Sequence, residues 1–485
     1  LRIEPVGTSF TSTFLTSNWP FDSSLGGLTI GKSGNTANVT IDSATTIAGP
    51  VDITGGVLSV NAPLTATNST LKLKGSSISD GASGYLVADQ LAILGGAVAL
   101  DHTSNNVNTL AASGVSSFTY VNSGALTIGT VNPTGITATG DVRIETLTGD
   151  LTLAASVTTS STSSTAVLLN AGKSIAAGTS TGGNLLVTGS PTVTAGTGGV
   201  IRLMSGSVAD STGLTNLVGA GSGHFRYNSD ETDTRFTWAL DTDVINAIYR
   251  EQPTATATIN SFTTSYGFDH GLTLANWMLD GVSPLSTQRV AVNGDTQVSG
   301  LGVVIENASY SNAGKLKYNA TPYTLTDGLS KLGYAMNQSG GSQLTVEQKS
   351  IDLANFSLNN KVYDGNVAAT FRATNGASIG FSGLVSGDLV TYSSGTGTFD
   401  TRHVGTGKAV TITGVVMAGA DLNNYSVRLA SGNGTANITQ LSSATWIGTG
   451  TGNWSDASQW AVTGALGQTG VIPDGANVGT AVLPS

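Results

Sequence analysis

Two short glycine motifs have the spacing of sites that bind phosphate or hydrolyse esters. Residues 26–33 read Gly-Gly-Leu-Thr-Ile-Gly-Lys-Ser, which fits the phosphate-loop pattern G-x-x-x-x-G-K-S. Residues 178–182 read Gly-Thr-Ser-Thr-Gly, which fits the G-x-S-x-G turn that presents a hydrolase serine. Both chemistries need a helix directly after the motif, and the small polar residues that follow here do not favour one. We therefore interpret both motifs as chance matches in a glycine-rich chain.

The histidines are too few and too scattered to indicate a metal site. They are His102, His224, His270 and His403, and none stands at the spacing of zinc ligands. His270 directly follows Asp269, a pair that we interpret as part of a turn. Calcium repeats of the G-G-x-G-x-D type are missing as well. The sequence predicts neither a metal site nor a cofactor.

Paired carboxylates are the one arrangement in this chain that would suit catalysis, because glycosidases place two acids about 5–10 Å apart in a cleft. The acids are densest in two groups, namely Asp141 with Glu145, and the run of Asp230, Glu231 and Asp233. The second group lies in the aromatic-rich range 227–238, which offers both the acids and the stacking rings of a carbohydrate site. We favour a solvated cap with aromatic side chains buried beneath it, and predict no catalytic residues.

Strands must position these groups, because residues 25–204 are a succession of short apolar runs that alternate at period two. Examples are Leu28-Thr29-Ile30, Val39-Thr40-Ile41, Leu71-Lys72-Leu73, Val142-Arg143-Ile144 and Leu151-Thr152-Leu153. Gly, Ser, Thr, Asn and Asp separate the runs and predict sharp turns. Very short strands at loosely repeated spacing favour a parallel β-helix over a sandwich or a barrel, although the period is irregular.

The sequence thus predicts an all-β chain of four parts. Residues 1–250 are expected to form the β-helix (a solenoid), with an aromatic cap at about 225–250. Two immunoglobulin-like β-sandwich modules are expected at 254–350 and 351–439, since their size and strand density suit that fold. Residues 440–485, rich in Gly, Trp and Asn, are expected to begin a further β segment.

Composition argues against several partners. Charged residues are 10% of the 485, far below the roughly 25% of an ordinary soluble domain. Acidic residues outnumber basic ones by 30 to 20, for a net charge of −10. Binding to nucleic acid or to an anionic membrane needs clustered Lys and Arg, which this chain lacks, so we predict neither. The absence of cysteine fits a chain that is exported unfolded, since a premature disulfide would lock it.

The start of the chain predicts a processed segment. Residues 1–20 have neither the basic start nor the apolar core of a signal peptide, and the chain opens with Leu1. No apolar stretch approaches the ~20 residues that span a bilayer as a helix. We therefore expect a segment of a longer precursor whose export signal lies upstream.

Several landmarks resemble those of large bacterial exoproteins of the filamentous-haemagglutinin type. They are residues 129–136 (GTVNPTGI), 170–174 (NAGKS), 223–231 (GHFRYNSDE) and 247–253 (AIYREQP).

The second half of the chain resembles modules found in such proteins. Residues 361–366 (KVYDGN), 381–388 (FSGLVSGD) and 422–425 (LNNY) look like the YDG repeat. Residues 310–314 (YSNAG) are similar to the MBG family of bacterial immunoglobulin-like modules, and residues 446–475 resemble the start of an autotransporter-type β-helix repeat.

The resemblance implies export across the outer membrane, often by two-partner secretion with an outer-membrane partner, and display as an adhesin. It brings no catalytic residues, because the family shares no active site. We expect a rod-like, non-catalytic adhesin at the bacterial surface or secreted from it, which contacts a receptor or glycan on host or neighbouring cells. The alternatives are a structural stalk or self-assembling fibre subunit without its own ligand and, less favoured, a polysaccharide-active enzyme.

Overall fold

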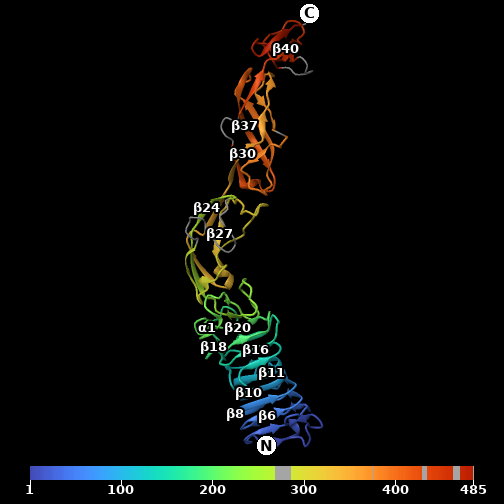
Figure 1. Cartoon of the computed structure of the whole chain (residues 1–485), viewed down its shortest axis with the longest axis vertical. Coiled ribbons are helices and arrows are strands. Elements are labelled where there is room, and N and C mark those ends of the chain that lie inside the picture. Colours follow the sequence, from blue (N-terminus) through green and yellow to red (C-terminus); the bar gives the residue numbers. More distant parts are fainter. Residues whose placement is uncertain (268–285, 375, 429–433, 463–469, 484–485) are drawn as a thin grey trace. The chain divides into compact units, whose positions relative to one another are not determined.

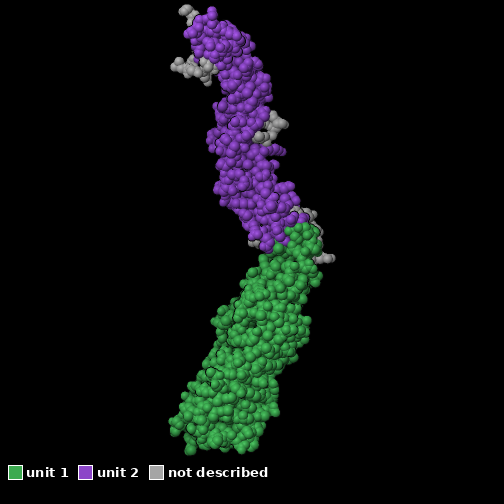
Figure 2. All heavy atoms as spheres, turned by 180° about the vertical axis from the view of Figure 1, so that it is seen from behind, with its two compact units in different colours: residues 1–260, 271–304, 326–342 green, residues 261–270, 305–325, 343–485 purple. Residues whose placement is uncertain are grey.

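The computed structural model describes residues 1–267, 286–374, 376–428, 434–462 and 470–483. The chain divides into two compact units, which Figure 2 colours separately. The first comprises Leu1–Asn260, Gly271–Val304 and Thr326–Ser342, and the second Ser261–His270, Ile305–Leu325 and Gln343–Ser485. Strands dominate both units, which confirms the all-β prediction. No helix in the described part of the chain is long and apolar enough to span a membrane.

The first unit is built on a column of parallel strands that runs through residues 14–249. Each strand pairs with the next, so that successive passes of the chain stack on one another (Figure 1). In order the strands are β2 (Phe14–Leu15), β4 (Val39–Ile41), β7 (Val57–Val60), β9 (Ser77–Asp80), β10 (Leu86–Leu100), β11 (Asn106–Asn122), β14 (Val142–Thr146), β17 (Val167–Ala171), β20 (Ile201–Ser205) and β22 (Ile245–Tyr249). At ~4.8 Å between neighbouring strands, the steps from β2 to β22 extend about 43 Å.

Apolar side chains at every second position form the interior of this column. The stacked, buried residues are, in order of pairing, Val39, Leu58, Ile78, Val98, Phe118, Val142, Val167 and Ile201. The residues between them face the other way, as the two-residue period of a strand requires. Each large apolar side chain removed from water contributes about 1.5–3 kcal/mol, so the alternating pattern supplies most of the stabilisation.

The register reveals a repeat length that the sequence pattern left irregular. Leu58, Ile78, Val98 and Phe118 lie 20 residues apart. The later intervals lengthen to 24, 25, 34 and finally 44 residues. The two longest intervals arise because residues 172–184 and 206–244 are inserted between strands.

Further columns of parallel strands lie beside the first. One contains β1 (Arg2–Ile3), β3 (Leu28–Ile30), β6 (Val51–Thr54) and β8 (Leu64–Lys74), and another joins β5 (Thr45–Ile47) to β8. After β11 two series follow, namely β12 (Leu126–Ile128), β15 (Leu151–Leu153) and β18 (Leu185–Val187), and β13 (Ile136–Ala138), β16 (Val157–Thr159) and β19 (Val193–Thr194). The inward residues of all columns belong to one hydrophobic core.

The aromatic-rich range 225–250 has two parts, and it includes β21 (Phe225–Arg226). The aromatic residues at its two ends are fully buried in the core, namely Phe225, Tyr227 and Tyr249. Residues 228–244, which we call the strap, lie on the outer face of the last strands. There Phe236 and Leu240 pack against three outward-facing apolar side chains, Leu168, Met204 and Ile248. The middle of the range expected as a cap therefore covers one side of the column.

Residues 254–350, expected as one module, contribute strands to both units. In the first unit β23 (Thr254–Ile259) pairs antiparallel with β25 (Ser286–Val290) and parallel with β28 (Ala335–Ser339). Another sheet has the order β24 (Phe262–Ser265), β29 (Gln343–Glu347), β27 (Tyr323–Asp327) and β26 (Val303–Ile305).

Small and mainly antiparallel sheets follow from residue 349 in the second unit. β30 (Lys349–Ala354) lies between β35 (Gly380–Ser382) and β38 (Tyr425–Arg428), and β31 (Phe356–Leu358) pairs with β34 (Phe371–Ala373). The longest sheet has the order β32 (Lys361–Val362), β39 (Thr435–Thr439), β37 (Gly405–Ala418), β36 (Thr391–Phe399) and β33 (Ala368–Ala369). β40 (Leu441–Trp446) pairs with β41 (Trp460–Val462) and β42 (Val478–Val482). One hydrophobic cluster contains both Phe399 and Trp460, so the segment from residue 440 shares a core with residues 351–439.

Candidate functional site

The structure brings one acid from each of the two predicted groups together on the first unit. Arg143 and Glu145 stand two residues apart on β14 and therefore project to the same side. Arg143 donates to Glu145 through Nε and Nη2, both at 2.9 Å, and through Nη2 also to Glu231 of the strap. Lys173, from the insertion after β17, donates to Glu145 at 2.6 Å. We call these four side chains the ionic cluster.

Burial separates the pKa values of the two carboxyl groups in this cluster. The side chain of Glu145 is fully buried, whereas those of Arg143 and Lys173 are each 36% exposed. Burial raises the pKa of Glu145, and the neighbouring Glu231 raises it further, against the effect of the two cations. Burial also opposes the ionisation of Glu231, but hydrogen bonds with Glu145 and Arg143 outweigh it and lower the pKa of Glu231.

Two carboxyl groups with separated pKa values are the arrangement of an acid–base pair. Both accept from the same nitrogen of Arg143, so they lie within about 6 Å of each other. Glu145 nevertheless has no exposed surface, and the adjoining pocket of about 420 Å³ has no aromatic side chain among its lining residues. The geometry therefore suits an ionic lock that holds the strap and the insertion at residues 172–184 against β14.

Asp230 strengthens this lock from within the strap. Its carboxylate accepts from the backbone N–H of Ala177 at 2.8 Å and from those of Thr232 and Asp233 at 2.7 Å each. Burial opposes the ionisation of Asp230, but these hydrogen bonds and that of the Thr232 hydroxyl outweigh it and lower its pKa to about 2. The bond to Ala177 ties the strap to the insertion at residues 172–184.

The other predicted acids do not join the cluster. Asp141 accepts from three hydroxyl groups of a nearby turn, those of Ser161, Ser163 and Thr165. Asp233 pairs with Arg235, two residues further along the strap, at 2.7 Å. Both acids thus stabilise local turns.

Neither of the two glycine motifs from the sequence, at residues 26–33 and 178–182, leads into a helix. In residues 26–33 the central Leu28–Ile30 is strand β3, and residues 31–38, all of which are described, contain no helix. Residues 178–182 form an irregular loop that leads into β18. Neither motif has the strand–turn–helix geometry that its chemistry requires.

The three histidines that the structure describes have separate partners. The Nδ1 atom of His102 accepts from the backbone N–H of Ser104, that of His224 lies 3.1 Å from Asp241, and that of His403 lies 3.0 Å from Asn477. His270 falls outside the described residues. Within the described residues, no three His, Asp or Glu side chains converge where they would hold a metal ion.

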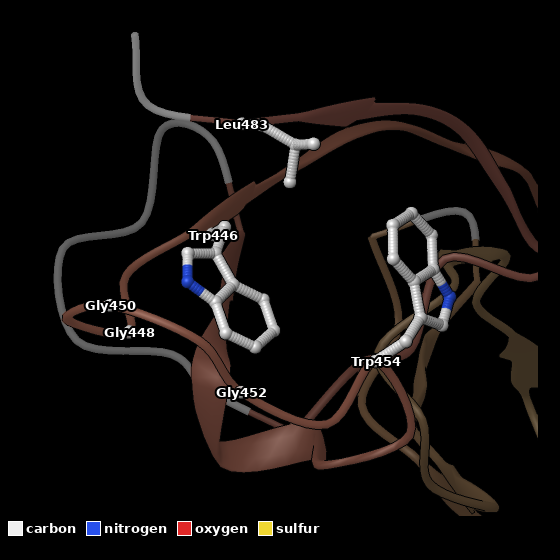
Figure 3. Close-up of a pocket in the computed structure, with 6 residues that line it drawn as sticks. All are labelled: Trp446, Gly448, Gly450, Gly452, Trp454 and Leu483. Carbon is white, nitrogen blue, oxygen red and sulfur yellow. The ribbon is translucent and has the colours of Figure 1, made fainter.

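A second pocket, which the sequence analysis did not identify as a site, lies between two tryptophans of the second unit (Figure 3). Trp446 and Trp454 stand on opposite sides of it, Leu483 lies along another side, and the loop that contains Gly448, Gly450 and Gly452 borders Trp446. Its volume is about 330 Å³. We call it the indole pocket. The signal in the sequence is the run 446–454 (WIGTGTGNW), in which every second residue between the two tryptophans is glycine.

A third, buried tryptophan supports both walls of the indole pocket. Trp460 meets Trp446 edge-to-face with ring centroids 5.1 Å apart, and it meets Trp454 in the same way at 4.6 Å. Trp454 Nε1 donates to the carbonyl oxygen of Pro473 at 2.9 Å, and Trp460 Nε1 donates to the carbonyl oxygen of Trp454 at 3.0 Å. Both indoles are thus fixed by the core beneath them.

The motif at residues 361–366 forms a turn whose residues have separate structural roles. Tyr363 is buried in the core of the second unit. Asp364 accepts from the backbone N–H of Asn366 at 3.1 Å and from Lys361 Nζ at 2.8 Å. Gly365 has a φ of +79°, and a Cβ there would lie 2.6 Å from the carbonyl oxygen of Gly470. The tyrosine, aspartate and glycine are therefore all required by the turn.

The other landmarks of the second unit meet at one polar joint. Asp388 accepts from the hydroxyl groups of Tyr266 and Tyr425 at 2.5 Å each, and from the backbone N–H of Ala313 at 3.1 Å. Burial opposes the ionisation of Asp388, but these hydrogen bonds outweigh it and lower its pKa. Close by, Asp421 accepts from Asn312 Nδ2 at 2.9 Å. The joint ties residues 310–314 to the motifs 381–388 and 422–425.

The first unit contains a similar arrangement in a drier setting. Asp295 is fully buried and accepts from Tyr227 at 2.7 Å and from Tyr334 at 2.8 Å. Burial raises the pKa of Asp295 despite the two hydroxyl donors. A carboxylate held between two tyrosines therefore fastens distant segments of the chain in both units.

The part of the chain that carries the 361–366 turn and the Asp388 joint matches a known domain family. Residues 347–453 match the YDG domain family. They form a YDG domain. The match confirms the YDG part of the sequence resemblance, and its C-terminal bound lies 14 residues beyond the expected 439. The YDG domain therefore includes Trp446 and the glycines of the indole pocket but not Trp454.

The match to the YDG domain covers about a fifth of the chain. No curated protein and no solved structure matches the chain.

Proposed function

We propose that this chain is a rod-like, non-catalytic segment of a bacterial adhesin of the filamentous-haemagglutinin type, secreted or displayed at the cell surface. In this proposal the parallel columns of residues 1–250 are a β-helix. Residues 254–350 are an MBG-like module, the YDG domain is an immunoglobulin-like sandwich, and residues 440–485 belong to an autotransporter-like repeat. An outer-membrane secretion partner exports the chain, and a receptor or glycan on another cell is its ligand.

The observation that carries the proposal is the column from β2 to β22. It extends about 43 Å with a continuous apolar interior, as a spacer needs. The outward positions of its earlier strands are mostly small and polar, as at Thr40, Ser59 and Thr119. The YDG domain adds support, because YDG repeats belong to the modules that the sequence resembles.

The non-catalytic part of the proposal rests on the ionic cluster. Its buried carboxyl, Glu145, would have to reach a substrate to act as an acid or base, and the strap covers it. The pocket beside it offers no ring for sugar stacking. These features favour a structural role for the best acid pair in the described residues.

Adhesion is tested with the full 485-residue chain coupled to beads. We expect saturable binding of the beads to epithelial cells, bacterial cells or glycan-coated surfaces, with competition by the free chain and none by serum albumin, whose beads serve as control. Failure of the folded chain to bind any of these surfaces would refute the adhesin proposal. If the chain also sediments as a growing assembly, the fibre subunit is the better description.

A further inference from the structure

The indole pocket has two aromatic walls that are held in place before any ligand arrives. Trp454 is 48% exposed, although its Nε1 is bound to Pro473 and its ring edge rests on Trp460. An exposed side chain of this size would normally gain entropy by moving freely. Because these contacts fix it, little further entropy is lost when a ligand stacks on it.

The glycine loop places backbone groups where side chains would otherwise stand. A Cβ at Gly452 would lie 2.5 Å from the ring of Trp446, and a Cβ at Gly448 would lie 2.8 Å from it. Only glycine lets the backbone pass this close to the indole. No described residue forms a hydrogen bond with the backbone of residues 448–452. Within the described residues, the N–H and C=O groups of the loop are therefore free to bind a ligand beside the Trp446 ring.

The chemistry of the lining selects an uncharged, amphipathic ligand. The lining residues are Trp446, Gly448, Gly450, Gly452, Trp454 and Leu483, none of which is charged. A pyranose ring has apolar C–H faces that pack on indoles and a rim of hydroxyl groups that pair with backbone amides. A quaternary ammonium ion also prefers indole faces, but no carboxylate lines this pocket to balance its charge.

The dimensions of the pocket agree with one or two sugar rings. Its volume of about 330 Å³ is at the lower end of the range for small-molecule sites, which is about 300–1,000 Å³. Both outer indoles contact Trp460, so their centroids are at most about 10 Å apart. A ring packed against both would need about 7–8 Å.

We propose that the indole pocket binds a neutral pyranoside of one or two rings, so that this part of the chain is its glycan-binding site. The inference rests on the proposed adhesin role for the choice of a glycan, but its chemistry is tested independently of adhesion.

The test is a calorimetric titration of the full chain with maltose, lactose, cellobiose and methyl α-mannoside. We expect saturable binding of at least one sugar. Trp454→Ala should weaken it about tenfold, because it removes one of the two indole faces on which the C–H face of the sugar packs, and a loss of about 1.4 kcal/mol is tenfold in affinity. The matched control is Trp19→Ala, which removes an indole of similar exposure, 46%, that stacks on Phe14 far from the pocket in sequence. It should leave the affinity unchanged.

A second pair of variants guards against misfolding of Trp454→Ala. Gly452→Ala inserts one methyl group against Trp446 and should also weaken sugar binding. Gly7→Ala adds the same group where nothing lies within 4 Å, and it should leave sugar binding unchanged. Circular dichroism checks that each variant keeps its strands.

Three outcomes would overturn the inference. They are the absence of saturable binding to all four sugars, equal affinities of the Trp454→Ala and Trp19→Ala chains, and saturation by tetramethylammonium in place of a sugar. A chain that binds sugar but no cell would leave the pocket standing and remove the adhesin role. A chain that adheres to cells but binds none of the four sugars would keep the adhesin role and remove the glycan-binding pocket.

Discussion

Neutralising Glu145 should release the strap from the outer face of the first unit. Glu145 accepts three charge-assisted hydrogen bonds, two from Arg143 at 2.9 Å and one from Lys173 at 2.6 Å. Glu145→Gln removes the negative charge that accepts these hydrogen bonds. Glu231 is then the one carboxylate left in the cluster for both Arg143 and Lys173. The net charge of the four side chains changes from zero to positive. The substitution preserves size, so packing changes little.

The magnitude follows from burial. Removing one partner of a fully buried ion pair costs about 3–5 kcal/mol. Both cations are 36% exposed and regain water, and the raised pKa of Glu145 shows that burial already offsets part of the ion-pair attraction. Together these effects reduce the expected loss to about 1–2 kcal/mol. That loss corresponds to an open population of the strap that is about 5–30 times larger. Hydrogen exchange of residues 228–244, measured by mass spectrometry on the full chain, reports this opening.

The control is another Arg–Glu pair with the same spacing. Arg2 and Glu4 also stand two residues apart and form an ion pair, but the Arg2 side chain is 74% exposed. Glu4→Gln should change local exchange little, because exposed pairs contribute about 0–1 kcal/mol. Unchanged exchange of the strap in Glu145→Gln, or an equal effect of Glu4→Gln on its own surroundings, would refute the argument from burial.

Three further predictions concern the acid response, the joint and the core. Because the pKa of Asp230 is depressed to about 2, its contribution to holding the strap is present above its unfolded pKa of 3.8 and is lost as the pH falls through about 2. Asp230→Asn should therefore reduce the pH dependence of the strap's exchange between pH 4 and pH 2. The same pH dependence in this variant as in the unchanged chain would contradict the prediction. Asp388→Asn should weaken two short tyrosine hydrogen bonds and lower the unfolding free energy of the second unit by about 1–2 kcal/mol, and an unchanged urea midpoint of that unit would contradict this. Leu169→Ala should destabilise the first unit by about 2–5 kcal/mol because its side chain is fully buried, whereas Val57→Ala, at a side chain 38% exposed on β7, should cost under about 1 kcal/mol; equal urea midpoints for the two would refute the assignment of the core.

The sequence was sufficient for the strands and their inward faces, because period-two alternation is a local property. Leu28-Thr29-Ile30 and Leu151-Thr152-Leu153 are strands with the expected buried, half-buried, buried pattern. The 20-residue interval was harder to recognise, since it holds only between Leu58 and Phe118 and later insertions obscure it. Which strand pairs with which is decided by stacking along the column, and this information is not local.

The functional features divided in the same way. The two acid groups were visible in the sequence, but only the strap's position shows that Glu231 and not Asp141 joins Glu145. The environment of Glu145 includes a residue almost ninety positions away, since Glu231 of the strap contributes to its raised pKa. The indole pocket needs Leu483 and Trp446 side by side, and this follows from the pairing of β42 with β40. A tryptophan–glycine alternation was the only local trace of that pocket.

The stacking of β7, β9, β10 and β11 at 20-residue intervals has a consequence for how the chain acquires its structure. Every new pass needs only the preceding pass as a template, so the loop that must close is short at each step. Folding can then propagate strand by strand from whichever end is delivered first, and each added strand makes unfolding of the preceding ones less favourable. A chain threaded through a narrow opening would fold on the far side at the pace of its delivery, and the folded part could not slip back. The regular part of the column would in that case act as a ratchet while the chain is delivered.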